Sequence, residues 1–155
     1  MRDKPKTLSK LFYLLIFIIT SNLLLMGCAR HIGVYIQAAN DLNNGGNPVV
    51  VRIYQLTTDV NFKSETSETF WKNRQLSFER DARGEPKEIM LHPREVVKIE
   101  KLVIDDETIY LGVAADFYEP DKDQWYYISD ISKNNCDQVL IAVRKNTLVM
   151  TCVDD

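Results

Sequence analysis

Histidine is nearly absent from this chain of 155 residues, in which only His31 and His92 occur. His31 lies three residues after Cys28, and His92 precedes Pro93 in an expected turn, so neither is expected on the inward face of a strand. Ser-His and Cys-His catalytic sites need a base within hydrogen-bond reach of the nucleophile. We therefore predict that the protein is not an enzyme.

Metal-binding motifs are also missing. Acidic residues cluster in two expected loops, but the glycine and the ligand spacing of an EF-hand-type calcium loop are absent. A carboxylate pair for glycoside chemistry would need a cleft between its two members. We interpret the carboxylates as solvated turn charges and predict no metal site. They are Asp105, Asp106 and Glu107 in one loop, and Asp116, Glu119, Asp121 and Asp123 in the other.

Long hydrophobic runs are limited to Leu11–Met26, which three polar residues interrupt at positions 20–22. Its 16 residues fall short of the about 20 that a membrane-spanning helix needs. Basic residues precede the run and Leu-Leu-Leu-Met-Gly-Cys28 ends it, an arrangement typical of a bacterial lipoprotein signal peptide. We predict cleavage after residue 27 and acylation of Cys28. An ordinary cleaved signal peptide and an uncleaved anchor are the alternatives. The basic residues are Arg2, Lys4, Lys6 and Lys10.

Ala29 follows this cysteine, at the place where Asp would be the usual signal for retention in the inner membrane. We therefore expect diacylglycerol and an N-acyl chain on Cys28, and no other cofactor, to hold the protein in the inner leaflet of the outer membrane, facing the periplasm. The 128 residues from Cys28 onward suffice for one domain, and we predict a lipidated tether at 28–33 and the domain at 34–155. Their formal charge of −6 argues against nucleic acid as a partner.

The other cysteines, Cys136 and Cys152, form an even pair in a compartment that permits oxidation. If Lys145-Asn146 is a two-residue hairpin turn, Cys152 faces Val139 and Cys136 lies about 10 Å away along the ladder. A bend at Asn134-Asn135 would bring the two cysteines together, so we predict a possible structural disulfide. Two separate thiols, at least one of them packed in the core, are the alternative.

Short strands account for most of the remaining chain. Val49, Val51 and Ile53 share one face opposite Arg52, and the odd-numbered residues from Ile109 to Phe117 share one face opposite Gly112 and Asp116. Many such strands separated by turns predict an all-β fold, a two-sheet antiparallel β-sandwich. The expected strands are Ile32–Ala39, Val49–Leu56, Ile89–Leu91, Val96–Ile104, Ile109–Phe117, Trp125–Ile131, Val139–Arg144 and Leu148–Val153.

One short additional helix is expected between Thr57 and Asn73, where Thr58 or Asp59 can cap it and neither Pro nor Gly occurs. Its apolar residues cluster at its two ends, so we expect it to lie on the sandwich as a lid. They are Val60, Phe62, Phe70 and Trp71.

The stretch between the first two strands is the most loop-like part of the chain. It has no Lys, Ser or Thr and therefore does not fit a phosphate-binding loop. Eight residues are more than a hairpin needs, so the stretch is either a simple linker or a partner-binding loop. It consists of Asp41, Leu42, Asn43, Asn44, Gly45, Gly46, Asn47 and Pro48.

An aromatic cluster beside the second acidic loop suggests a different function, that of a periplasmic ligand- or peptidoglycan-binding lipoprotein. Core packing of the same side chains is the simpler interpretation. The cluster consists of Tyr118, Trp125, Tyr126 and Tyr127.

Two segments together with Cys28 carry a family resemblance. Pro48–Leu56 reads Pro-Val-Val-Val-Arg-Ile-Tyr-Gln-Leu and Tyr110–Phe117 reads Tyr-Leu-Gly-Val-Ala-Ala-Asp-Phe. The chain resembles the TssJ (SciN-type) family, outer-membrane lipoproteins of bacterial type VI secretion, over essentially all of residues 28–155. Ser64–Thr69 departs from the family because it is more polar than the helix of relatives.

The resemblance implies a transthyretin-like β-sandwich, no enzymatic activity, and docking to the periplasmic C-terminal region of the inner-membrane protein TssM, in a complex that also contains TssL. In the family the loop between the first two strands is implicated in this contact. That loop corresponds to Asp41–Pro48 here.

Overall fold

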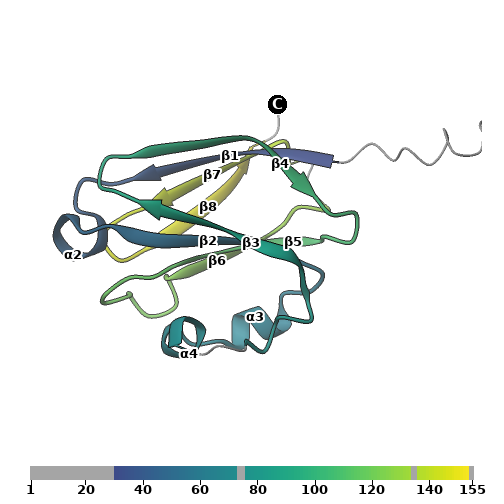
Figure 1. Ribbon diagram of the computed structural model, residues 1–155, viewed down its shortest axis with the longest axis horizontal. Coiled ribbons are helices and arrows are strands. Elements are labelled where there is room, and N and C mark those ends of the chain that lie inside the picture. Colours follow the sequence, from purple (N-terminus) through teal and green to yellow (C-terminus); the bar gives the residue numbers. More distant parts are fainter. Residues whose placement is uncertain (1–29, 73–75, 134–135, 154–155) are drawn as a thin grey trace, which may run out of the picture.

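The computed structural model describes residues 30–72, 76–133 and 136–153, which form two four-stranded sheets packed face to face (Figure 1). Sheet A has the order β4-β1-β7-β8 and sheet B the order β3-β2-β5-β6, which confirms the β-sandwich. Within the described ranges no helix is long and apolar enough to cross a membrane. The elements are β1 (Arg30–Ala38), α2 (Leu42–Gly46), β2 (Val49–Leu56), α3 (Val60–Ser64), α4 (Ser67–Lys72), β3 (Ala82–Leu91), β4 (Val96–Ile104), β5 (Tyr110–Ala115), β6 (Tyr126–Asp130), β7 (Gln138–Val143) and β8 (Leu148–Val153).

Two features of the strands differ from the prediction. First, β1 and β7 pair in parallel, whereas the other strand pairs in the described ranges are antiparallel. The chain crosses from sheet B to sheet A after β6 and enters beside the start of β1, where the Gly33 amide donates to the Asp137 carbonyl at 2.9 Å. Second, β3 begins at Ala82 rather than Ile89. Its first half is an edge segment rich in polar residues, so it lacks the apolar alternation that marks a strand.

The start of β1 corrects the expected tether at residues 28–33. Arg30–Gly33 belong to β1, and only Cys28 and Ala29 of that segment lie outside the described residues. Ile32 is fully buried, and an Arg30 guanidinium nitrogen donates to the Ile131 carbonyl at 2.9 Å. Both contacts attach this segment to the sandwich. One residue, Ala29, therefore separates Cys28 from the first strand.

The core lies between the sheets, as the alternation predicted, because Val49, Val51 and Ile53 of β2 are at most 3% exposed. Ile109 is an exception, since it precedes β5 and is 39% exposed. The other face of β5 is also covered, because Gly112 and Ala114 are buried. The helical segment after β2 provides this second layer.

Two short helices, α3 and α4, replace the single predicted helix, and they lie on the side of sheet B away from sheet A (Figure 1). Glu65 interrupts the helical conformation with an extended backbone (φ −72°, ψ 145°), and its carboxylate accepts hydrogen bonds from Thr69 and Ser77. Beneath the helices, Phe62 and Phe70 pack on Tyr54 of β2, with ring centroids 5.7 and 5.8 Å away. The predicted lid is therefore present, and an aromatic cluster holds it.

Gly112 is required by this packing. A Cβ at this position would lie 3.0 Å from Leu56 Cδ1 and 3.1 Å from the Phe62 ring. We expect Gly112→Ala to lower the free energy of unfolding by about 1–3 kcal/mol, the usual cost of overpacking a core. Urea unfolding followed by circular dichroism measures the effect. Gly33→Ala is the matched control, because its Cβ would meet its nearest atom at 3.6 Å. Equal stability of the two variants would contradict tight packing of Phe62 on β5.

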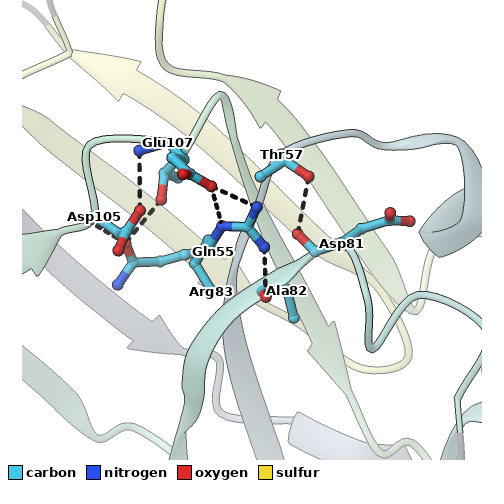
Figure 2. A network of polar contacts seen from close by, with 8 residues as sticks. Gln55, Thr57, Asp81, Ala82, Arg83, Asp105 and Glu107 are labelled. Carbon is cyan, nitrogen blue, oxygen red and sulfur yellow. Dashed lines mark hydrogen bonds and ion pairs between the residues drawn. The ribbon is translucent and has the colours of Figure 1, made fainter.

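A polar network joins the two sheets at the end of the sandwich where β1 begins (Figure 2). The Gln55 amide of β2 donates to the Val103 carbonyl of β4 at 3.0 Å, and the Gln55 carbonyl oxygen accepts from the Asp105 amide at 2.8 Å. Glu107 pairs with Arg83 of β3. At least this carboxylate of the first acidic loop is therefore part of a structural ion pair.

A disulfide joins Cys136 to Cys152, whose Cα atoms are 5.6 Å apart. Cys152 pairs with Val139 in the β7–β8 ladder, the register expected from a turn at Lys145-Asn146. Asn134-Asn135, where a bend was predicted, lie outside the described residues. The bond connects β8 to the segment between β6 and β7.

Candidate partner-binding surface

The loop between β1 and β2 has an unusual backbone. Asn43, Asn44, Gly45 and Gly46 all have positive φ angles, between 48° and 115°. Side chains with a Cβ rarely adopt this left-handed conformation, and Asn and Gly tolerate it best. The Asn-Asn-Gly-Gly sequence is therefore what allows the chain to form the tight turn labelled α2.

Two residues of this loop are buried and hold it on the sandwich. Leu42 is fully buried, and Asn43 is 8% exposed. The Asn43 amide group donates to the Pro48 carbonyl at 2.8 Å, while its carbonyl oxygen accepts from the Tyr118 backbone amide, also at 2.8 Å. The Asn47 backbone amide closes the turn by donating to the Leu42 carbonyl at 3.1 Å. The eight-residue loop therefore has a defined conformation, which buried side chains and hydrogen bonds hold in place.

Three neighbouring loops form hydrogen bonds with the segment between β1 and β2. Asn44 donates through its side chain to Glu119 at 3.2 Å and through its backbone to the Lys145 carbonyl at 3.2 Å. Arg94, which itself has a φ of +65°, donates from its side chain to the Asn40 side chain. These loops come from distant parts of the chain and meet at the end of the sandwich opposite the start of β1 (Figure 1).

The bonds bring together two features that the sequence showed separately, the loop 41–48 and the second acidic loop. Tyr118 of the acidic loop is 81% exposed, although its backbone is bonded to Asn43. An exposed aromatic ring on a fixed backbone is a common anchor of protein interfaces. We refer to the exposed residues of loop 41–48, together with the neighbouring Tyr118 and Glu119 of the acidic loop, as the loop-end surface, which consists of Asp41, Asn44, Gly45, Asn47, Pro48, Tyr118 and Glu119.

Charge on this end is mixed. Asp116 lies at the start of the acidic loop, where partial burial raises the pKa of its carboxyl group and the charge of Arg52 partly offsets the shift. Lys122 and Lys145 lie in the same set of loops as Asp121. The loop-end surface itself carries the acidic residues Asp41 and Glu119 and hydrogen-bonding amides, and Lys122 and Lys145 supply positive charge in the loops beside it. Such a mixture is common in the polar parts of protein interfaces.

The remaining predicted site residues do not join this surface. Trp125 is 2% exposed and packs on Phe70 at 5.1 Å between ring centroids, so this member of the predicted aromatic cluster is a core residue, whereas Tyr118 and Tyr127 are exposed. His31 and His92 are both exposed, the first on β1 and the second in the turn between β3 and β4. Cys28 lies outside the described residues. Among the residues that the structure describes, no group of three His, Cys, Asp or Glu side chains could hold a metal ion.

A separate hollow of about 530 Å³ lies beside α4 and β3. The Arg52 guanidinium stacks over the Trp71 ring at 4.7 Å and pairs with Glu88 at 2.7 Å. Among the described residues that line the hollow there is no histidine, cysteine or serine, so a Ser-His or Cys-His pair is not among them.

A β-sandwich that presents hydrogen-bonded loops at one end is typical of small domains that bind other proteins through those loops. The sequence family of type VI secretion lipoproteins, described as VasD, EvfM and TssJ, matches residues 30–146. The chain therefore belongs to this family of membrane-bound lipoproteins, structural components of the type VI secretion membrane complex. No curated protein sequence matches it.

Solved structures agree with this assignment. The lipoprotein TssJ1 from Pseudomonas aeruginosa aligns with a TM-score of 0.71 and 20% identity, covering 83% of this chain and 99% of that one. A chain of a type VI membrane complex aligns with a TM-score of 0.70 and 27% identity, covering 82% and 100%. A chain in the structure described as the TssM C-terminal domain from EAEC aligns with a TM-score of 0.67 and 28% identity, covering 79% and 98%.

Proposed function

We propose that this protein is an outer-membrane lipoprotein, anchored by acyl chains on Cys28, which docks the periplasmic C-terminal region of TssM through the loop-end surface. The observation that carries the proposal is the position of this surface. It lies at the end of β1, opposite the strand's start next to Cys28 (Figure 1). The nine residues of β1 span about 30 Å, so the anchor and the docking loops are well separated.

The resemblance to chains in structures that contain type VI membrane components, one of them described by its TssM domain, supports the choice of partner. Docking would connect an outer-membrane anchor to an inner-membrane protein and so help to assemble the complex that also includes TssL. Two anchored proteins meet at a high effective concentration, which allows a modest loop interface to hold.

Tyr118 provides a sharp test. We expect Tyr118→Ala to weaken binding to the TssM periplasmic region at least about tenfold, or about 1.4 kcal/mol, because exposed aromatic anchors often carry such energies. Isothermal titration calorimetry with residues 29–155 measures the change. The ring is 81% exposed, so the variant should keep the stability of the parent protein.

Val60→Ala is the matched control, since Val60 is 67% exposed on α3, away from the loop-end surface. A second variant that shortens residues 41–48 should also lose binding while its circular dichroism shows a folded sandwich. If the intact, folded domain does not bind TssM, the proposed partner is wrong. If the intact domain binds TssM and both loop variants bind it equally well, TssM is the partner but the loop-end surface is not where it binds.

A further inference from the structure

The outer face of sheet A, which points away from sheet B, carries little charge on β1, β7 and β8, whereas the edge strand β4 exposes Lys98 and Glu100. The register aligns Tyr35, Leu140 and Thr151 in one row across β1, β7 and β8, and Gln37, Ala142 and Val149 in the next. These rows contain no acidic or basic residue, although 26% of the whole chain is charged. We refer to these six residues as the sheet A face.

Apolar side chains are exposed on this side of the molecule. Leu140 and Val149 are 45% and 43% exposed, and Val96 and Val103 on the adjoining edge strand β4 are 62% and 55% exposed. Val96 pairs with Gln37 and Val103 pairs with His31, so both side chains belong to the same side of the sheet. Exposed apolar groups gathered on one side of a small domain mark a candidate interaction surface.

The start of β1 indicates what covers it. Arg30 is only two residues from Cys28, and two residues of extended chain reach about 7 Å at most. If Cys28 is acylated, as the proposed function requires, the start of β1 must lie at the level of the lipid headgroups. The domain can then contact the membrane either with the end of the sandwich where β1 begins or with one of the faces next to β1.

Contact through that end is disfavoured by charge. Ile104 pairs with Arg30, and Asp105, Asp106 and Glu107 follow it directly. Arg30 and Arg83, which pairs with Glu107, offset part of this charge, so this cluster of five residues is weakly acidic. Anionic headgroups would repel these carboxylates. The six residues of the sheet A face carry no carboxylate, and the edge beside them carries Lys98, whose ammonium group lies 5.3 Å from the Tyr35 ring centroid and 3.4 Å from the Glu100 carboxylate. Lysine and tyrosine are suited to such a boundary because they combine an apolar body with a polar tip.

We infer that the lipid-anchored domain lies on the phospholipid surface with its sheet A face, an inference that rests on the proposed acylation of Cys28. In this orientation β1 runs along the membrane plane. The loop-end surface then faces sideways into the periplasm, and TssM meets it beside the membrane.

The test uses the mature, acylated protein, residues 28–155, in vesicles of phosphatidylethanolamine and phosphatidylglycerol. The vesicles also contain a phospholipid whose acyl chain carries a photoreactive carbene precursor. Flotation first reports whether the protein is anchored. After illumination, mass spectrometry locates the labelled peptides. We expect the peptides with Tyr35, Leu140 and Val149 to be labelled several-fold more than the peptide with Met90, which is 56% exposed on sheet B.

A double variant, Leu140→Glu with Val149→Glu, should still float but lose this labelling, and Met90→Glu should change nothing. Circular dichroism checks that each variant is folded. A protein that does not float contradicts acylation and thus the proposed anchor. A protein that floats without labelling of the sheet A face overturns the orientation alone. If the unlipidated domain sediments as a dimer that the double variant converts to monomers, the face belongs instead to a second copy.

Discussion

Phe62→Ala is expected to lower the free energy of unfolding by about 3–5 kcal/mol, the usual cost of truncating a buried phenylalanine. Phe62 is fully buried, and its ring lies 4.6 Å from Phe78, 5.6 Å from Phe70 and 5.9 Å from Tyr126 between centroids. Removing it leaves a cavity at the point where α3, α4 and sheet B meet. Such a loss is a large part of the total stability of a domain, which is commonly about 5–15 kcal/mol.

Urea unfolding, followed by tryptophan fluorescence and by circular dichroism, measures this loss. Val60→Ala in the same helix is the control, because a side chain that is 67% exposed should change stability by less than about 0.5 kcal/mol. A cost below about 1 kcal/mol for Phe62→Ala would mean that the site collapses around the smaller side chain. In that case the aromatic cluster does not hold the lid.

Reduction of the Cys136–Cys152 disulfide has the second large expected effect, a loss of about 2–4 kcal/mol. The bond closes a loop between residues 16 positions apart, and chain entropy alone gives about 3 kcal/mol for a loop near this length. The reduced chain also frees the segment between β6 and β7, to which Arg30 is bonded through the Ile131 carbonyl. Reduction should therefore loosen the start of β1 as well.

The measurement compares urea unfolding with and without dithiothreitol. The double variant Cys136→Ala with Cys152→Ala should resemble the reduced protein and show no response to dithiothreitol. Hydrogen exchange reports the local effect, with faster exchange expected in β8 and at the first residues of β1. Identical unfolding curves under oxidising and reducing conditions would show that the bond adds no stability.

Most strands could be predicted because they bury one face, and burial on one face produces a period of two in the sequence. Parallel pairing of β1 with β7 could not be predicted, since alternation does not record strand direction. The helical segment was predicted as one helix because its composition contains no breaker. The interruption at Glu65 comes from hydrogen bonds with Ser77, a contact twelve positions away.

The loop between β1 and β2 could be predicted as a candidate site from its length and composition, but its architecture could not. Asn43 is a turn residue by sequence, and only the fold shows it buried between Pro48 and Tyr118. Tyr118 is 75 positions away from Asn43, so no local pattern connects them. The predicted tether is too long. Arg30 and His31 are polar, so the sequence gives no sign that β1 begins at Arg30, two residues before its first buried side chain, Ile32.

The parallel pairing of β1 with β7 also affects how the protein folds. β1 is the first strand to be made and β7 the second to last, so the centre of sheet A joins the two ends of the domain. Contacts between such distant segments form slowly, because the chain between them must first be closed into a loop. Sheet A therefore cannot be completed until nearly the whole chain is available, and if the protein is exported as proposed, that point comes late in its translocation.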